Sequence, residues 1–251
     1  MLKLIVNADD LGLTPGCTDG IIKGLTKGIV TDTSLMVNTP FTDEAVSKLK
    51  ENGIERVGLH LNVSWGRPLL PAGEVPSLVD ENGFFRRKVA QAAYGMRLDE
   101  VRRELAVQAE RFMATGLGLT HLDSHHHAHS FSPITEAALE LAKQFGVPLR
   151  QTNDGLRETI RRQGLVTTDA IELDFYEQGV NLEHLKQILI EHPEGTLEIM
   201  CHPAETDELL YDISSYNSWR DKELAILTSR EMRSFIEEQG IQLISFDGLS
   251  G

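Results

Sequence analysis

The chain has 251 residues, and its 24 Lys and Arg residues against 38 Asp and Glu residues give a formal net charge of −14 at pH 7. A surface this acidic repels phosphate backbones, which excludes nucleic acid as a partner. No run reaches the roughly 20 apolar residues of a membrane span, the N-terminal MLKLIVNADD lacks a signal-peptide core, and Cys17 and Cys201 form no CxxC pair. We therefore expect a reduced, cytoplasmic protein without a membrane partner.

Short apolar runs alternate with longer amphipathic segments along the chain. The runs that read as strands of a parallel sheet are 3–8, 33–37, 56–62, 119–123, 147–151, 170–175, 197–202 and 241–246. Capping residues, prolines and glycines bound the helices expected at 14–28, 42–53, 99–116, 132–146, 181–193 and 228–240. This alternation favours one α/β domain over residues 1–251, either a (β/α) barrel or a doubly wound sheet.

The segment 64–95 interrupts the alternation. It is rich in proline and aromatic residues and follows the end of a predicted strand, where α/β proteins place their sites. It is either a substrate-facing loop or lid, or a packed excursion that covers one end of the barrel, and the sequence leaves both open.

The first predicted strand ends in two adjacent carboxylates, Asp9 and Asp10, followed by Leu11 and Gly12. Neighbouring strand residues point to opposite faces, so both carboxylates serve one site only if the chain leaves the pleat, which Gly12 would permit. Two adjacent carboxylates also repel each other unless a cation or hydrogen bonds hold them. The alternative is that one of them simply caps the following turn.

Histidines gather unevenly, with five of the nine in HLDSHHHAH at 121–129. If the fourth strand continues to His125, then His121, Asp123 and His125 share one face. If a helix begins earlier, His125 and His129 share a face instead. In either case His125 is a candidate metal ligand that Asp123 could orient. His60, alone in an apolar strand, is either a second ligand or a core histidine.

The carboxyl ends of successive parallel strands meet on one face, so Asp9, Asp10, His60 and His125 could meet there. One carboxylate with two imidazoles leaves positions open for water and substrate, as in catalytic metal sites. His202 ends another strand and is either a general acid or base or a turn histidine before proline.

These motifs also carry a family resemblance. The chain resembles the YdjC/ChbG carbohydrate deacetylases over essentially its whole length. The segments that carry the resemblance are NADDLGLTPG, TSLMVN, GLHLN, THLDSHHHAH, MCHPA and the closing LTSREM…IQLISF. The resemblance implies a distorted (β/α) barrel of the glycoside hydrolase/deacetylase type with about seven parallel strands, and a homodimer. It also implies metal-dependent removal of N-acetyl groups from sugars such as chitooligosaccharides, including diacetylchitobiose.

Carried over to matching positions, the resemblance assigns the metal to Asp10, His60 and His125, the catalytic base to Asp9 and the acid to His202. The family metal is Mg²⁺, whereas two imidazoles suit Zn²⁺ or another transition metal better. Leu11 stands where phenylalanine often follows the acidic pair in the family.

Three other functions account for these residues less well. A glycoside hydrolase needs two carboxylates roughly 5–9.5 Å apart, and the histidines would go unexplained. A two-His-one-carboxylate iron oxygenase fits the ligand types, but the acid and base residues favour hydrolysis. A non-catalytic, metal-dependent sugar-binding protein would have no need of Asp9 and His202.

Overall fold

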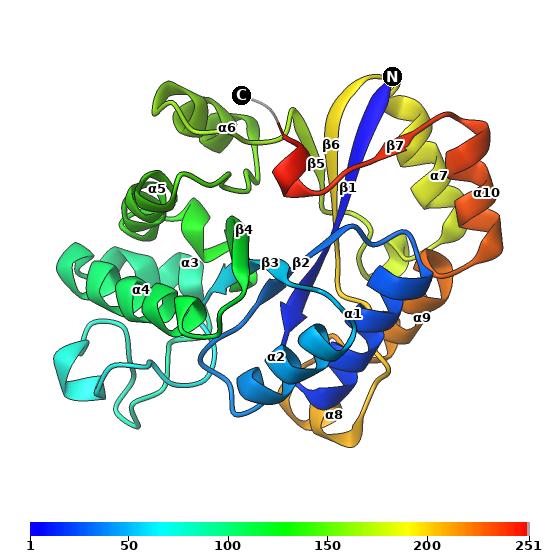
Figure 1. The fold of residues 1–251 in the computed structure, drawn as a ribbon. Helices are drawn as coiled ribbons and strands as arrows, with labels where there is room; N and C mark the ends of the chain where they lie inside the picture. The colour runs from blue at the N-terminus through cyan, green and yellow to red at the C-terminus, as the bar shows by residue number, and fades with distance from the viewer. Residues whose placement is uncertain (250–251) are drawn as a thin grey trace.

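Parallel strands form one sheet in the computed structural model, which describes residues 1–249 (Figure 1). The strands are β1 (Leu2–Leu11), β2 (Asp32–Leu35), β3 (Arg56–Leu61), β4 (Gly118–Ser124), β5 (Ala170–Glu172), β6 (Gly195–Cys201) and β7 (Gln242–Leu243). Their order is β4-β3-β2-β1-β6-β5, with β7 also paired to β1. All of these pairings are parallel. The expected sheet of about seven parallel strands is confirmed.

The strand order is that of a ring cut between β4 and β5, not that of a doubly wound sheet. In a doubly wound sheet the strand after the crossover lies beside the first strand, whereas here β5 lies at the far edge and the later strand β6 lies beside β1. The gap is bridged by irregular backbone: Leu149 forms a single parallel bridge with Leu122 of β4, and its N–H donates to the carbonyl of Val166 at 3.1 Å. The fold is therefore a distorted (β/α) barrel.

Four predicted strands differ clearly from the observed ones. The run 147–151 forms only that single bridge, because Pro148 has no N–H to donate to a ladder. The runs 170–175 and 241–246 shorten to β5 and β7, while the first strand extends beyond Ala8 to Leu11.

Ten α-helices flank the sheet within the described residues (Figure 1). They are α1 (Pro15–Lys27), α2 (Thr42–Glu51), α3 (Val89–Ala92), α4 (Leu98–Met113), α5 (Ile134–Phe145), α6 (Asp154–Arg162), α7 (Leu182–Glu191), α8 (Glu208–Ile213), α9 (Ser218–Leu227) and α10 (Arg230–Glu238). Each expected helix is present, and Thr14, Asn181 and Ser229 cap their helices as such residues do. No helix among residues 1–249 is both long and apolar enough to cross a membrane.

The segment 64–95 packs onto the barrel. Val75, Leu78, Val79 and Phe85 are buried in the main hydrophobic core, and Phe85 N–H donates to the carbonyl of Gly66 at 2.9 Å. The packed-excursion alternative therefore describes most of this segment.

Candidate active site

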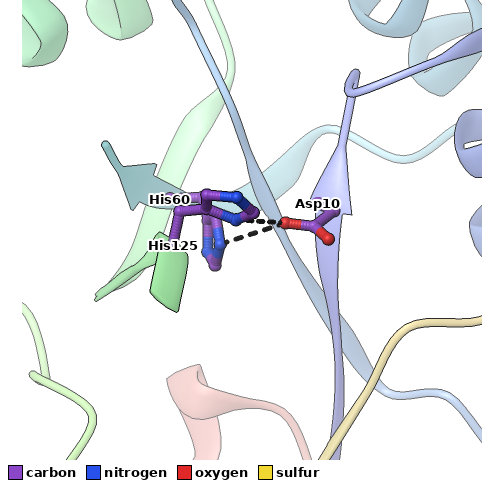
Figure 2. Close-up of side chains that lie close together, drawn as sticks. All are labelled: Asp10, His60 and His125. Atoms are coloured by element: carbon purple, nitrogen blue, oxygen red, sulfur yellow. Dashed lines mark hydrogen bonds and ion pairs between the residues drawn. The ribbon is translucent and has the colours of Figure 1, made fainter. Parts of the chain in front are cut away.

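The carboxyl ends of β1, β3 and β4 bring three of the predicted residues together (Figure 2). Asp10 Oδ1 lies 2.8 Å from His125 Nδ1 and 3.4 Å from His60 Nε2. All three side chains are buried, and their potential ligand atoms lie within 4.8 Å of one another. Three ligand atoms thus converge on one point, as a metal site requires.

Asp10 reaches this point because the strand is irregular there. Its φ is +68°, a left-handed conformation that residues with a Cβ rarely adopt, and the register of β1 against β2 shifts between Ala8 and Leu11. Such a bulge re-aims side chains, so the neighbours Asp9 and Asp10 both line the same cavity. The chain leaves the pleat at Asp10 itself, two residues before Gly12.

His60 is oriented from behind by polar partners. Its Nδ1 lies 2.8 Å from Asp123 Oδ1 and 3.0 Å from Ser34 Oγ, which leaves Nε2 facing Asp10. A carboxylate behind a histidine is the usual support of a metal-binding imidazole. The hypothesis that Asp123 orients His125 is therefore wrong, because Asp123 contacts His60 instead. Burial lowers the pKa of His60, but Asp123 and Asp10 outweigh it and raise the pKa to about 10.

The histidine cluster divides at the end of β4. The strand ends at Ser124, so His125 belongs to the following turn, and neither proposed periodicity applies. His129 is buried, with Nδ1 2.5 Å from Ser124 Oγ. His121 stacks on Phe246 with a centroid distance of 3.8 Å. Neither His121 nor His129 lines the cavity.

Asp9 is held by a buried arginine. The Arg150 guanidinium donates to Asp9 Oδ2 at 2.6 Å and to Oδ1 at 2.7 Å, and its Nε donates to Glu198 Oε1 at 2.6 Å. Burial raises the pKa of Asp9, but the Arg150 charge outweighs it and leaves the pKa below its usual value. Asp9 is therefore ionised at neutral pH.

Asp10 has an arginine partner as well. Arg220, in α9, donates from Nη2 to Asp10 Oδ2 at 2.7 Å. Burial opposes the shift, but His125 and Arg220 hold the pKa of Asp10 well below its usual range. Oδ2 is thereby occupied, and Oδ1 is the oxygen that faces the two histidines.

His202 lies beyond the end of β6 and lines the cavity. Its backbone N–H donates to Glu223, which also accepts the Tyr216 hydroxyl. Burial, with the nearby Arg220 charge, lowers the pKa of His202 to about 3, so its ring is neutral at pH 7. The adjacent Cys201 donates from Sγ to the carbonyl of Asn7 at 3.2 Å, and burial raises its pKa well above the usual value, as expected for a thiol that is not a nucleophile.

The cavity that these residues share has a volume of about 530 Å³, which lies within the usual range for a small-molecule site. Trp65 and Arg87 bring the segment 64–95 to its wall. Tyr176 and Tyr216 stack on each other at 4.0 Å between ring centroids and line it as well. The segment 64–95 therefore both packs on the core and contributes to the site.

Sequence reasoning missed four residues of this site: Arg150, Tyr176, Tyr216 and Arg220. Arg150 left one signal, since an arginine inside the apolar run 147–151 is expected to be buried with an acidic partner. Tyr176, Tyr216 and Arg220 lie outside every strand predicted from the sequence, so no periodicity marked them.

The donor set fits a divalent metal ion. A second group, Asp9, His60 and Asp123, also lies close together, but Arg150 already contacts both of these carboxylates. Asp10, His60 and His125 are thus the better candidate ligands. Two imidazole nitrogens and one carboxylate oxygen suit a transition metal.

Comparison with known proteins finds relatives over nearly the whole chain. The family model described as YdjC-like protein matches residues 3–238. A protein of Thermoanaerobacter pseudethanolicus named "Carbohydrate deacetylase" is 38% identical over 98% of both chains. One of the same name from Oceanobacillus iheyensis is 41% identical over 94% of this chain and 100% of its own.

Solved structures share the fold. A crystal structure from Enterococcus faecalis V583, named as a "putative cellobiose-phosphate cleavage protein", has a TM-score of 0.93 at 35% identity and covers 99% of both chains. A Streptococcus mutans CE4 esterase has a TM-score of 0.56 at 13% identity, covering 97% of this chain and 85% of its own. At that identity the second likeness concerns the fold alone.

Proposed function

Because the chain belongs to the YdjC-like protein family, whose curated relatives here are named carbohydrate deacetylases, we propose that it hydrolyses the N-acetyl group of an acetylated sugar and releases acetate. One observation carries the proposal: a carboxylate and two imidazoles converge beside a separate, ionised carboxylate at one cavity. Metal-dependent amide hydrolysis uses this combination, a site for a metal together with a group that accepts a proton.

Asp10, His60 and His125 would hold the metal, with Asp123 and Arg220 fixing His60 and Asp10 from behind. When bound, a divalent metal lowers the pKa of water and polarises the acetamide carbonyl. Because the pKa of His60 is about 10 without a cation, we expect metal binding to release a proton.

Asp9 is the proposed base. Arg150 keeps its carboxylate ionised and fixes its plane, so the carboxylate is ready to take the proton of the attacking water. Water adds to the acetyl carbon, the C–N bond breaks, acetate leaves, and the sugar amine takes up a proton.

His202 is the proposed source of that last proton. Since its pKa is about 3, it carries no proton to give at the start of the reaction at pH 7. We therefore propose that it receives one during the reaction, from the water by way of Asp9, and passes it to the leaving amine.

The substrate that we propose is an N-acetylglucosamine oligosaccharide such as diacetylchitobiose, in oligosaccharide degradation. A cavity of about 530 Å³ can take a sugar unit. The proposed metal is Mg²⁺, as in the family, or a transition ion, which the ligand types favour. A homodimer of single-domain chains is the proposed assembly.

Acetate release from N-acetylglucosamine and diacetylchitobiose tests the proposal, measured with chelator and after addition of Mg²⁺, Zn²⁺, Mn²⁺ or Co²⁺. We expect release that chelator abolishes and at least one metal restores. Absence of acetate under every metal would refute the proposed function.

A further inference from the structure

His127 is a cavity residue to which the proposed chemistry gives no role. Its ring lines the cavity beside Asp9, yet its buried Nδ1 has no hydrogen-bond partner within residues 1–249. Most buried polar side-chain atoms are paired, so an unpaired one at a site calls for an explanation. Its Nε2 is not among the fully buried unpaired atoms, which makes it the ring nitrogen available to a molecule in the cavity.

The backbone that carries this ring is strained. His127 has φ 51° and ψ 35°, and His126 before it has φ 54° and ψ 27°. Two consecutive left-handed residues with a Cβ are unfavourable, and such strain gathers at functional sites. The two rings differ in their contacts, since His126 Nδ1 already lies 3.0 Å from Ser64 Oγ. Of the two histidines in this strained turn, only His127 has a buried ring nitrogen without a hydrogen-bond partner.

The unpaired Nδ1 favours one tautomer. An unpaired buried acceptor is tolerated more readily than an unpaired buried N–H, so the proton of the ring belongs on Nε2. His127 therefore offers a hydrogen-bond donor to the cavity. The charges that act on its ring most are those of Arg150 and Asp9, whereas His202 lies by Tyr176 and Tyr216. His127 and His202 thus lie in different parts of the cavity lining, His127 near Asp9 and His202 near the two tyrosines.

We propose that His127 is a catalytic residue that donates a hydrogen bond from Nε2 to the carbonyl oxygen of the acetamide. This inference rests on the proposed function. The carbonyl oxygen gains negative charge when water adds, and a fixed donor at that oxygen stabilises the charge more than it stabilises the substrate. The strained turn then fixes the direction of the donor before the substrate arrives.

The test compares His127→Asn and His127→Gly with His126→Asn at saturating metal. Asparagine tolerates the left-handed conformation and glycine relieves it, so the variants remove the ring without adding backbone strain. We expect kcat for acetate release to fall roughly 100- to 1000-fold in both His127 variants, with KM, bound metal and unfolding temperature unchanged. Free imidazole should partly restore His127→Gly. His126→Asn should keep most of its kcat.

Two outcomes overturn this inference alone: wild-type kcat in both His127 variants, or a loss confined to KM, which would make His127 a ligand of a sugar hydroxyl. If the wild-type protein releases no acetate with any metal, the proposed function fails, and this inference fails with it.

Discussion

The cavity has two sides that are built in different ways. The ligand side (Asp10, His60 and His125) stands at or next to the ends of β1, β3 and β4, which are neighbours in one parallel sheet except for the intervening β2. The facing wall (Tyr176, His202, Tyr216 and Arg220) comes from loops and from α9, after β5 and β6. The two sides meet where Arg220 donates to Asp10. We infer that the ligand side holds the metal, whereas the facing wall supplies His202 for proton transfer and sets the surroundings of Asp10.

Substitution of a metal ligand on the ligand side should have the largest effect on metal binding and acetate release. We expect His60→Ala or His125→Ala to lose both bound metal and acetate release, because two remaining ligands hold a metal weakly. Metal analysis of the purified protein, alongside the acetate assay, measures this. His184→Ala, which removes an exposed histidine, is the matched control and should keep both properties. Full metal content in His60→Ala would contradict the assignment.

Asp9→Asn should remove the proposed base and leave metal binding intact. We expect bound metal to persist while kcat falls roughly 100- to 10,000-fold, the usual contribution of a general base. The change also leaves the buried Arg150 short of a partner, which costs about 3–5 kcal/mol of stability. Glu198→Gln disturbs the same arginine without touching the carboxylate, so it should lose stability and keep most of its kcat. Normal turnover by a folded Asp9→Asn protein would rule out Asp9 as the base.

Substitution of Asp123, which contacts the ligand His60, should reduce metal binding less than substitution of a ligand does. Asp123→Asn removes the charge that orients His60, and we expect metal affinity to fall about 10- to 100-fold. Metal titration measured by acetate release should move to higher concentration and still reach near wild-type kcat. An unchanged titration curve would show that Ser34 alone orients His60.

Glu223, which accepts hydrogen bonds from His202 and Tyr216 of the facing wall, should affect the pH dependence of stability. Burial raises the pKa of Glu223 to about 8, from an ordinary value of 4.5. The folded state therefore binds a proton that the unfolded state releases, so stability falls as pH rises from about 4.5 to 8, by at most about 1.4 kcal/mol per pH unit. Glu223→Gln should remove this part of the pH dependence, measured by urea unfolding at pH 5, 6, 7 and 8. The same slope in both proteins would contradict the raised pKa.

Sequence patterns predicted the ligand side better than the wall, for physical reasons. His60 and the acidic pair lie in regular apolar runs that end on one side of a parallel sheet, so their meeting follows from topology. The left-handed Asp10 and the end of β4 at Ser124 are local departures that periodicity does not encode. Asp123 contacts His60 and not His125 because His60 and Asp123 are register partners in the parallel strands β3 and β4.

The wall depends on contacts distant in sequence. Arg220 meets Asp10 across 210 residues and Arg150 meets Asp9 across 141, and no local pattern identifies which carboxylate each arginine contacts. The α/β class was predictable because strand–helix alternation is local, whereas the choice of a barrel over a doubly wound sheet came from the family resemblance. The run 147–151 was the exception, since its apolar composition suited a strand but Pro148 limits it to a single bridge.

Stoichiometric metal addition tests the central claim most directly. Chelator-treated protein is titrated with the activating metal, and the rate of acetate release from diacetylchitobiose is followed. We predict a rate that rises to a plateau at one equivalent per chain in the wild-type protein and stays at zero in His60→Ala. Full activity of the metal-free protein, or the same titration in both proteins, would contradict the account.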